Sequence, residues 1–308
     1  MTFNQLRTFV AVADTGAVRA AAALLVVTPS AVSSALSSLQ DEVGTPLVMR
    51  EGRGLRLTEA GLIYADYARR ILGLLDEARG AAAGELDPGH GELRLAAVTT
   101  AGEQIVPRLL AGFRNRYPGA GLRLEVGNRD RVHALLDSHE ADVAIGGRPH
   151  PEGALQVHAV RRNDLVVVAP AGAYPGEDAV GWLGRQTWLL REHGSGTRAT
   201  TEGLLEQLEL HPRSLTLGSN VAIVEAVVSG LGVTLISHDA VARQVEDNTI
   251  MVLPFSQAPL RRDWHLVAHV GSLPATAQLF VDFVIETGQF HLADPERVPA
   301  PNGAPDGP

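Results

Sequence analysis

Three short segments carry hydroxyl or amide side chains where a strand is expected to give way to a helix. They are Thr99-Thr100, the run Gly194-Ser195-Gly196-Thr197-Arg198, and Ser219-Asn220. Free backbone N–H groups at a helix start favour an anion, and hydroxyls there add hydrogen-bond donors. The Arg198 guanidinium could hold a carboxylate or phosphate through two parallel hydrogen bonds. This chemistry predicts a binding site for a small anion.

A second cation, Arg148, follows two glycines in Gly146-Gly147-Arg148-Pro149 and could face the same site. Each feature also has a purely structural interpretation: the hydroxyls cap helices, Gly-Ser-Gly forms a turn, and the arginines make salt bridges. The prediction therefore depends on convergence of the three segments. Its candidate effector-binding residues are Thr99, Thr100, Arg148, Ser195, Gly196, Thr197, Arg198, Ser219 and Asn220.

A different chemistry is indicated near the N-terminus. Thr28 can cap a helix that begins with Pro29, and apolar residues at Val32, Leu36 and Leu39 give that helix one buried face. Its other face carries short hydroxyl side chains that could reach base edges or phosphates in a major groove. A solvent-facing helix of an ordinary bundle is the alternative. The candidate DNA-contacting residues here are Arg19, Thr28, Pro29, Ser30, Ser33, Ser34 and Ser37.

The flanking segments favour DNA binding. Thr2–Gln5 has the spacing of a capping box and starts a helix that ends at Gly16, and residues 17–25 predict a second helix. Strands at 47–50 and 55–57 would enclose an arginine-bearing tip, a wing, from which Arg50, Arg53 and Arg56 could contact phosphate. Residues 1–58 therefore predict a winged helix-turn-helix domain.

A single long helix, from Thr58 to about residue 83, is expected to link this domain to the rest of the chain. Apolar residues recur along it at spacings of four and three, which is typical of a seam between two helices. Packing on its own domain is the alternative. We expect residues 59–88 to pair with a second copy, so that a dimer or tetramer reads a dyad-symmetric site. The seam is Tyr64, Ala68, Ile71, Leu75, Ala78 and Ala82.

The body, residues 89–293, alternates expected strands and helices, which predicts α/β architecture with parallel sheets. Two crossings, near 165 and near 264–269, divide it into two lobes. Lobe I is expected at about 91–163 and 268–290, and lobe II at about 164–267. The Pro/Gly-rich segment 294–308 predicts a disordered tail.

Composition limits the possible functions. The 308 residues carry a net charge of −9, so attraction to DNA must be local, and residues 1–58 have five Arg against four acids. The chain has no cysteine, and we expect no metal site and no cofactor. Gly194-Ser195-Gly196 lacks the spacing of a nucleophile elbow, so an enzyme is not expected. With no signal peptide or long apolar run, we expect no membrane contact and a cytoplasmic location.

The order of these parts resembles a LysR-type transcriptional regulator from Phe3 to about Gly288. The resemblance rests on Ala20–Leu24, Val27–Ser33, Leu39-Glu42-Gly44-Pro46-Leu47-Arg50 and Leu57-Thr58-Gly61. It implies an N-terminal winged helix-turn-helix, a linker helix and a two-lobed effector domain similar to periplasmic-binding proteins. The chain departs from the family at Ala17-Val18, where a serine cap is usual, and at Ser34, Ser37 and Ser38, where longer polar side chains are usual.

The run at 192–198 is similar to a branch that includes regulators of carbon fixation and of sulfur assimilation. That branch often has proline where this chain has His193, so His193 joins the candidate effector residues. The sequence thus predicts a DNA-binding transcriptional regulator that responds to a small anionic metabolite. A solute-sensing protein with weak or lost DNA binding is the alternative.

Overall fold

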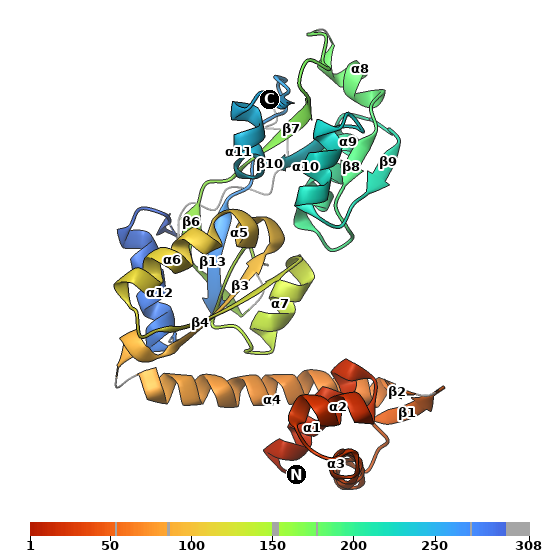
Figure 1. Ribbon diagram of the computed structural model, residues 1–308, viewed down its shortest axis with the longest axis vertical. Helices are drawn as coiled ribbons and strands as arrows, with labels where there is room; N and C mark the ends of the chain where they lie inside the picture. Colours follow the sequence, from red (N-terminus) through yellow and green to blue (C-terminus); the bar gives the residue numbers. More distant parts are fainter. Residues whose placement is uncertain (53, 85–86, 150–153, 177, 272, 294–308) are drawn as a thin grey trace, which may run out of the picture.

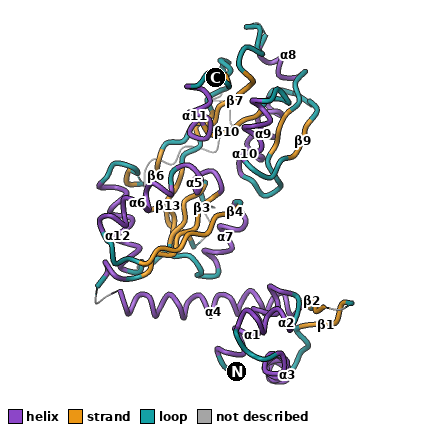
Figure 2. Tube along the Cα trace, in the orientation of Figure 1, coloured by secondary structure: helices purple, strands orange, loops and turns teal. Residues whose placement is uncertain are grey.

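The computed structural model describes residues 1–52, 54–84, 87–149, 154–176, 178–271 and 273–293. It is elongated and has three parts, a helical N-terminal domain, one long helix, and two lobes stacked beyond that helix (Figure 1). Figure 2 shows strands inside both lobes with helices around them. The expected tail 294–308 and Arg53 lie outside the described residues.

The N-terminal domain begins with helices α1 (Phe3–Thr15), α2 (Val18–Leu25) and α3 (Pro29–Val43). The predicted capping box of α1 is present, because the Gln5 backbone N–H donates to the Thr2 hydroxyl and the Thr2 backbone N–H donates to the Gln5 side chain. Thr28 caps α3 as expected, and Ala17 gives α2 no side-chain cap. The helices share one core that includes Phe9, Leu39 and Leu47.

The turn between α2 and α3 places Val26 in a left-handed conformation, with φ +55°. The Val26 N–H closes the end of α2 by donating to the Ala22 and Ala23 carbonyls. The helix pair bends by 107°. Among the described residues no single helix is long and apolar enough to cross a membrane; the bent pair meets that test by length and composition only.

The wing is a hairpin of β1 (Val48–Glu51) and β2 (Gly54–Leu57). Its base is fixed by Gln40, whose side-chain oxygen accepts from Leu47 N–H (2.8 Å) and Val48 N–H (3.2 Å). The Thr58 hydroxyl accepts from Gly61 N–H (2.9 Å), which starts the long helix α4 (Glu59–Gly84) where the sequence predicted it.

The predicted seam on α4 is only partly correct. Ala68 is buried and Tyr64 packs on the N-terminal core, because α1 already covers this face. The apolar face of α4 that is exposed is displaced from the predicted seam by about one residue along the helix. It comprises Leu62, Ile63, Tyr67, Ile71 and Leu74.

Lobe I contains a six-stranded sheet in the order β14-β6-β13-β5-β3-β4. The helices α5 (Thr99–Gln104), α6 (Val106–Arg116), α7 (Arg129–Asp137) and α12 (Ala275–Glu286) pack around it, and the short η1 (Pro88–His90) precedes it. The strands are β3 (Glu92–Val98), β4 (Gly121–Gly127), β5 (Val143–Gly146), β6 (Leu155–Arg161), β13 (Trp264–His269) and β14 (His291–Leu292).

Lobe II is built on β7 (Asp164–Pro170), which pairs with β10 (Thr234–Ser237), β11 (Ile250–Val252) and β12 (Leu260–Arg261). A second, two-stranded sheet joins β8 (Trp188–Leu190) and β9 (Ser214–Thr216). Its helices are α8 (Ala179–Gly184), α9 (Gly196–Gln207), α10 (Asn220–Val228) and α11 (His238–Glu246).

Three expectations differ from the structure. The sheets are not purely parallel. In lobe I, β13 pairs antiparallel with β5 and β6, whereas β3 pairs parallel with β4 and β5. In lobe II, β7 pairs antiparallel with β10, β11 and β12. β13 belongs to lobe I from Trp264 onward, so lobe I resumes before the expected residue 268. The helix expected over 102–113 is two helices that meet at Ile105, since Pro107 has no backbone N–H to donate to the carbonyl four residues earlier and therefore interrupts the helix there.

Candidate effector pocket and DNA-binding surface

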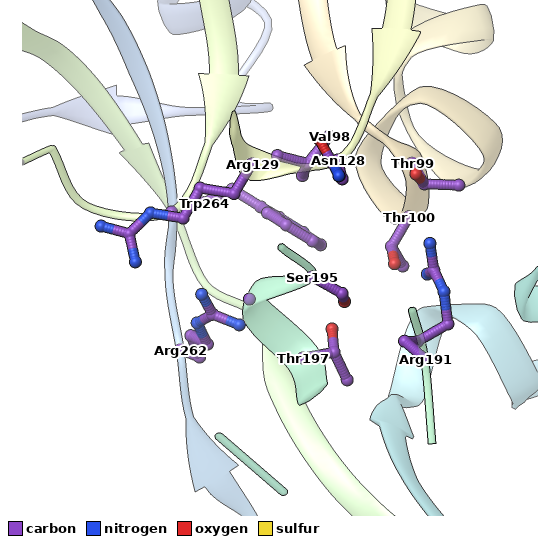
Figure 3. A pocket seen from close by; sticks show the side chains of 12 residues that line it. Val98, Thr99, Thr100, Asn128, Arg129, Arg191, Ser195, Thr197, Arg262 and Trp264 are labelled. Atoms are coloured by element: carbon purple, nitrogen blue, oxygen red, sulfur yellow. The ribbon is translucent and has the colours of Figure 1, made fainter. Parts of the chain in front are cut away.

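A pocket of about 40 Å³ lies between the lobes. Lobe I contributes the ends of β3 and β4, and lobe II contributes the start of α9. Figure 3 shows the hydroxyls of Thr100, Ser195 and Thr197 around the middle, with Arg262 on one side and Arg191 on the other. The lining residues are Val98, Thr99, Thr100, Asn128, Arg129, Gly147, Arg191, Ser195, Gly196, Thr197, Arg262 and Trp264.

Two helices of nine residues or more begin at the pocket. Asn128 caps α7 by accepting from Arg131 N–H at 2.9 Å, and Ser195 caps α9 by accepting from Arg198 N–H at 3.5 Å. Their first turns therefore present backbone N–H groups and the positive ends of helix dipoles. The pocket is electrostatically suited to an anion even before its arginines are considered.

Arg262 enters the pocket from the second crossing between the lobes. A Cβ atom added to Gly196 would lie 2.2 Å from its guanidinium, and one added to Gly147 would lie 3.2 Å away. Glycine at these two positions leaves room for the guanidinium where it lies. Burial, and then the nearby charge of Arg129, lower the pKa of the Arg262 guanidinium below its ordinary value.

The charges of Arg129 and Arg262 have no hydrogen-bonding or ion-pair partner among the described residues, whereas most arginines of this chain do. Two like charges held together in a partly buried site are unfavourable unless an anion compensates them. A further donor, the Trp264 indole Nε1, is buried and has no hydrogen-bond partner in the described part of the chain. Unsatisfied buried donors are rare in proteins, so this one calls for an explanation.

A buried hydrogen-bonded chain joins the lobes beside the pocket. We call it the Asn220 latch. The Asn220 amide donates to the Thr100 hydroxyl and to the Glu103 carboxylate, each at 3.0 Å, and its oxygen accepts from Arg191 at 2.6 Å. Arg191 also pairs with Glu192 at 2.8 Å. Asn220 therefore ties α5 of lobe I to lobe II.

Five of the ten predicted effector residues line this pocket: Thr99, Thr100, Ser195, Gly196 and Thr197. Thr99 donates to the Gly127 carbonyl at 3.1 Å, which joins the ends of β3 and β4. Asn220 lies in the latch, and Ser219 caps α10 without reaching the wall.

The three predicted cationic or titratable candidates do not line the pocket. Arg198 pairs with Glu202 at 2.8 Å and donates to the Arg191 carbonyl at 2.9 Å, so it braces α9 instead. His193 and Arg148 are exposed and are not among the residues that line the pocket. The cations that line the pocket are therefore not the predicted ones.

The pocket cations that sequence reasoning missed are Arg129, Arg191 and Arg262. Arg129 directly follows Asn128 at the end of β4, which is the same kind of strand-to-helix junction that identified Thr99. That signal was present in the sequence. Arg262 and Trp264 lie in a crossing segment, and only the fold brings such a segment to the pocket.

The predicted DNA-contacting residues lie on exposed surface. Arg19, Thr28, Pro29, Ser30, Ser33, Ser34 and Ser37 are all exposed, as are Arg50 and Arg56 on the wing. Some of their polar groups have local partners: Ser33 donates to the Pro29 carbonyl at 3.0 Å, and Arg56 pairs with Glu51 at 3.2 Å. The Arg50 side chain, by contrast, has no hydrogen-bonding or ion-pair partner among the described residues, and it is exposed on β1 of the wing.

Two family models together match most of the chain. Residues 3–62 match a bacterial regulatory helix-turn-helix protein of the lysR family, and residues 87–289 match a LysR substrate binding domain. The transcriptional regulator CbbR of Sinorhizobium medicae is 33% identical over 95% of both chains. The RuBisCO operon transcriptional regulator of Allochromatium vinosum is 34% identical, over 94% of this chain and 98% of its own.

Solved structures agree with the fold. A full-length OxyR variant from Pseudomonas aeruginosa has a TM-score of 0.68 at 23% identity, covering 92% of this chain and 95% of its own. The Synechocystis PCC6803 CcmR regulatory domain, in complex with 2-PG, has a TM-score of 0.59 at 30% identity; the match covers 64% of this chain and 96% of that one. The predicted winged helix-turn-helix, linker helix and two-lobed α/β domain are confirmed.

The relatives are named as transcriptional regulators and not as enzymes, in agreement with the sequence prediction. The similarity spans the DNA-binding domain as well as the body, which disfavours the alternative of a solute sensor that has lost DNA binding. The chain belongs to the LysR family of bacterial transcriptional regulators.

Proposed function

We propose that this regulator binds a small, multiply charged anion in the pocket between its lobes and that the bound anion changes how it holds DNA. The carrying observation is a pair of guanidiniums, Arg129 and Arg262, that have no partner within the described part of the chain and lie at the wall of a pocket that also receives two helix starts. A ligand with one negative charge would leave part of this positive charge unbalanced. A ligand with a phosphate, or with two anionic groups, suits it better.

The buried Trp264 N–H supports the same ligand class, since it can donate to an anionic oxygen at no further cost of desolvation. The CcmR domain, 30% identical, was solved with 2-PG, 2-phosphoglycolate, which carries a phosphate and a carboxylate. We therefore propose a short phosphorylated carboxylate as the effector class. The effector residues of this proposal are Thr99, Thr100, Asn128, Arg129, Ser195, Gly196, Thr197, Arg262 and Trp264.

We further propose that DNA binding uses a pair of chains. On α4 the side chains of Ile63 and Tyr67 are 63% and 60% exposed, and Ile71 and Leu74 continue the same face. An apolar helix face of this kind is expected to pair with a second copy. In such a pair, the two copies of α3 would be the recognition helices and would be related by a twofold axis. They would read a dyad-symmetric promoter site in the cytoplasm.

The test is calorimetric titration of the full chain with 2-phosphoglycolate, inorganic phosphate and glycolate. We expect 2-phosphoglycolate to bind tightest, because phosphate and glycolate each satisfy only part of the pocket. Fluorescence anisotropy on the DNA flanking its own gene, with scrambled DNA as control, then measures whether bound ligand changes DNA affinity. No binding of any of the three anions would refute the ligand class, and ligand binding without any effect on DNA would refute the regulatory role.

A further inference from the structure

Helix α7 runs from the effector pocket to the linker helix. Its first residue, Arg129, and its cap, Asn128, line the pocket. The residues that follow its last turn, Ser138 and His139, contact α4. Nine residues at about 1.5 Å each make it a short rod of roughly 13 Å. Figure 1 shows α7 between lobe II and α4.

The contact at the far end is close. A Cβ atom added to Gly73 of α4 would lie 1.9 Å from the Ser138 carbonyl oxygen, so only glycine permits this approach. One turn further along α4, the Glu77 carboxylate lies 2.7 Å from His139 Nδ1, and both side chains are largely shielded from solvent. A shielded ion pair or charged hydrogen bond is stronger than an exposed one.

The turn that receives α4 is rigidly held by lobe I. His139 has a left-handed backbone, with φ +57°, and its carbonyl accepts from the Arg94 guanidinium at 3.0 Å. Arg94 itself makes a buried ion pair with Asp142. The His139 ring stacks on His269 at 4.3 Å, and His269 Nε2 donates to the Leu136 carbonyl at 2.7 Å. The turn therefore moves together with α7 and lobe I as one body, and a movement of that body relative to lobe II carries α4 with it.

We propose that α7 transmits the state of the effector pocket to the linker helix, and that Gly73, Glu77 and His139 are the positioning residues of this junction. An anion that engages the start of α7 pulls on the rod at Asn128 and Arg129. The junction converts that pull into a new angle of α4, which carries the DNA-binding domain. This inference rests on the proposed effector pocket and adds the route by which it acts.

The first test compares Gly73→Ala with Gly80→Ala. Both add one methyl group to α4, but a Cβ at residue 80 meets nothing within 4 Å, so Gly80→Ala is a matched control. We expect Gly73→Ala to keep the calorimetric affinity for 2-phosphoglycolate within about twofold and to lose most of the ligand-induced change in DNA affinity. Glu77→Gln should lose part of it, and Gly80→Ala should keep all of it. A full response in Gly73→Ala and Glu77→Gln would overturn the proposal.

A second test needs no ligand. Asn128→Ala removes the cap of α7 at the pocket end. We expect it to change DNA affinity about threefold in the wild-type chain and to have almost no effect in Gly73→Ala, because the contact that transmits it is already disturbed. If Asn128→Ala changes DNA affinity equally in the wild-type chain and in Gly73→Ala, the proposal that α7 transmits the state of the pocket is overturned, even if 2-phosphoglycolate binds. A wild-type chain that ignores 2-phosphoglycolate but shows this coupling would refute the ligand class and leave the route intact.

Discussion

The two proposed functional regions of this molecule, the DNA-binding face and the effector pocket, present charge in opposite ways. On the DNA-binding face, the exposed recognition helix carries neutral serines, and the described cations Arg19, Arg50 and Arg56 lie around it. In the pocket, three arginines are gathered between the lobes, and two of them lack a partner among the described residues. DNA is an extended polyanion that a few peripheral cations can orient, whereas a small anion must be enclosed.

The contrast explains why the two regions were predicted with different success. A surface that reads DNA is built from one local segment, so periodicity and capping were enough to find α2, α3 and the wing. The pocket is assembled from five segments far apart in sequence. Sequence reasoning found its members at the starts of α5 and α9, missed Arg129 at the similar start of α7, and missed Arg262 and Trp264, which a crossing segment brings to the pocket.

The largest expected effect is that of Arg262→Gln, which keeps a polar side chain but removes the charged end of the guanidinium. Loss of one charged hydrogen bond to an anion costs about 1.5–3 kcal/mol, so 2-phosphoglycolate should bind about 10- to 100-fold more weakly. Calorimetry measures this, and the exposed Arg243→Gln of α11 is the control. Unchanged affinity would mean that the enclosed charge does not serve the ligand, and the contrast between the two regions would fail.

A smaller effect is expected of Trp264→Phe. This change keeps an aromatic ring but removes the buried N–H that has no partner in the described part of the chain. We expect about fivefold weaker binding of 2-phosphoglycolate, which corresponds to a loss of roughly 1 kcal/mol of binding free energy. The thermal stability of the free protein should be equal or higher. If affinity is unchanged, the indole does not point to the ligand and its burial has another cause.

On the DNA side, Arg50→Ala should weaken binding about threefold at physiological salt, to every sequence alike. One lost phosphate contact lowers the slope of log affinity against log salt by about 0.9. Anisotropy titrations from about 50 to 200 mM salt on specific and scrambled DNA measure both quantities. A loss confined to the specific site would instead assign Arg50 to base recognition, and the wing would no longer be a purely positioning element.

Val26 offers a further test in the same domain. A β-branched residue with positive φ is strained, and asparagine tolerates that conformation better. Val26→Asn should therefore stabilise the N-terminal domain by about 1 kcal/mol in denaturant unfolding. Val27→Asn, which changes a neighbour without positive φ, is the control. A stabilised variant with weaker DNA binding would show that the strained turn also contributes to recognition.

The smallest effect concerns pH. Burial lowers the pKa of the His265 imidazole, and of His158 as well. A base whose folded pKa is depressed is protonated more readily in the unfolded chain, so stability is present above the ordinary histidine pKa of about 6.5 and falls as pH drops below it. His265→Gln should lessen the loss of thermal stability between about pH 7 and pH 5. Equal losses in both proteins would assign the pH dependence to other groups.

Particular elements show where sequence reasoning stops. Gly16, Thr28 and Thr58 fixed the helix boundaries of the N-terminal domain because their effects are local. The face of α4 was misjudged by about one residue because Ala68 is small and apolar enough for either side, and only packing on α1 decides which side is covered. Arg198 resembled a ligand-binding cation, but Glu202 one turn away already neutralises it.

The Asn220 latch has a consequence for timing. Two hydrogen bonds from one buried amide, to Thr100 and Glu103, hold the lobes together beside the pocket, and we expect a metabolite to enter when the lobes separate and both bonds are broken. The association rate is then the encounter rate multiplied by the small fraction of time that the lobes spend apart, and dissociation is slowed by the same gate. Such a regulator averages brief fluctuations of its metabolite and responds to concentrations that persist.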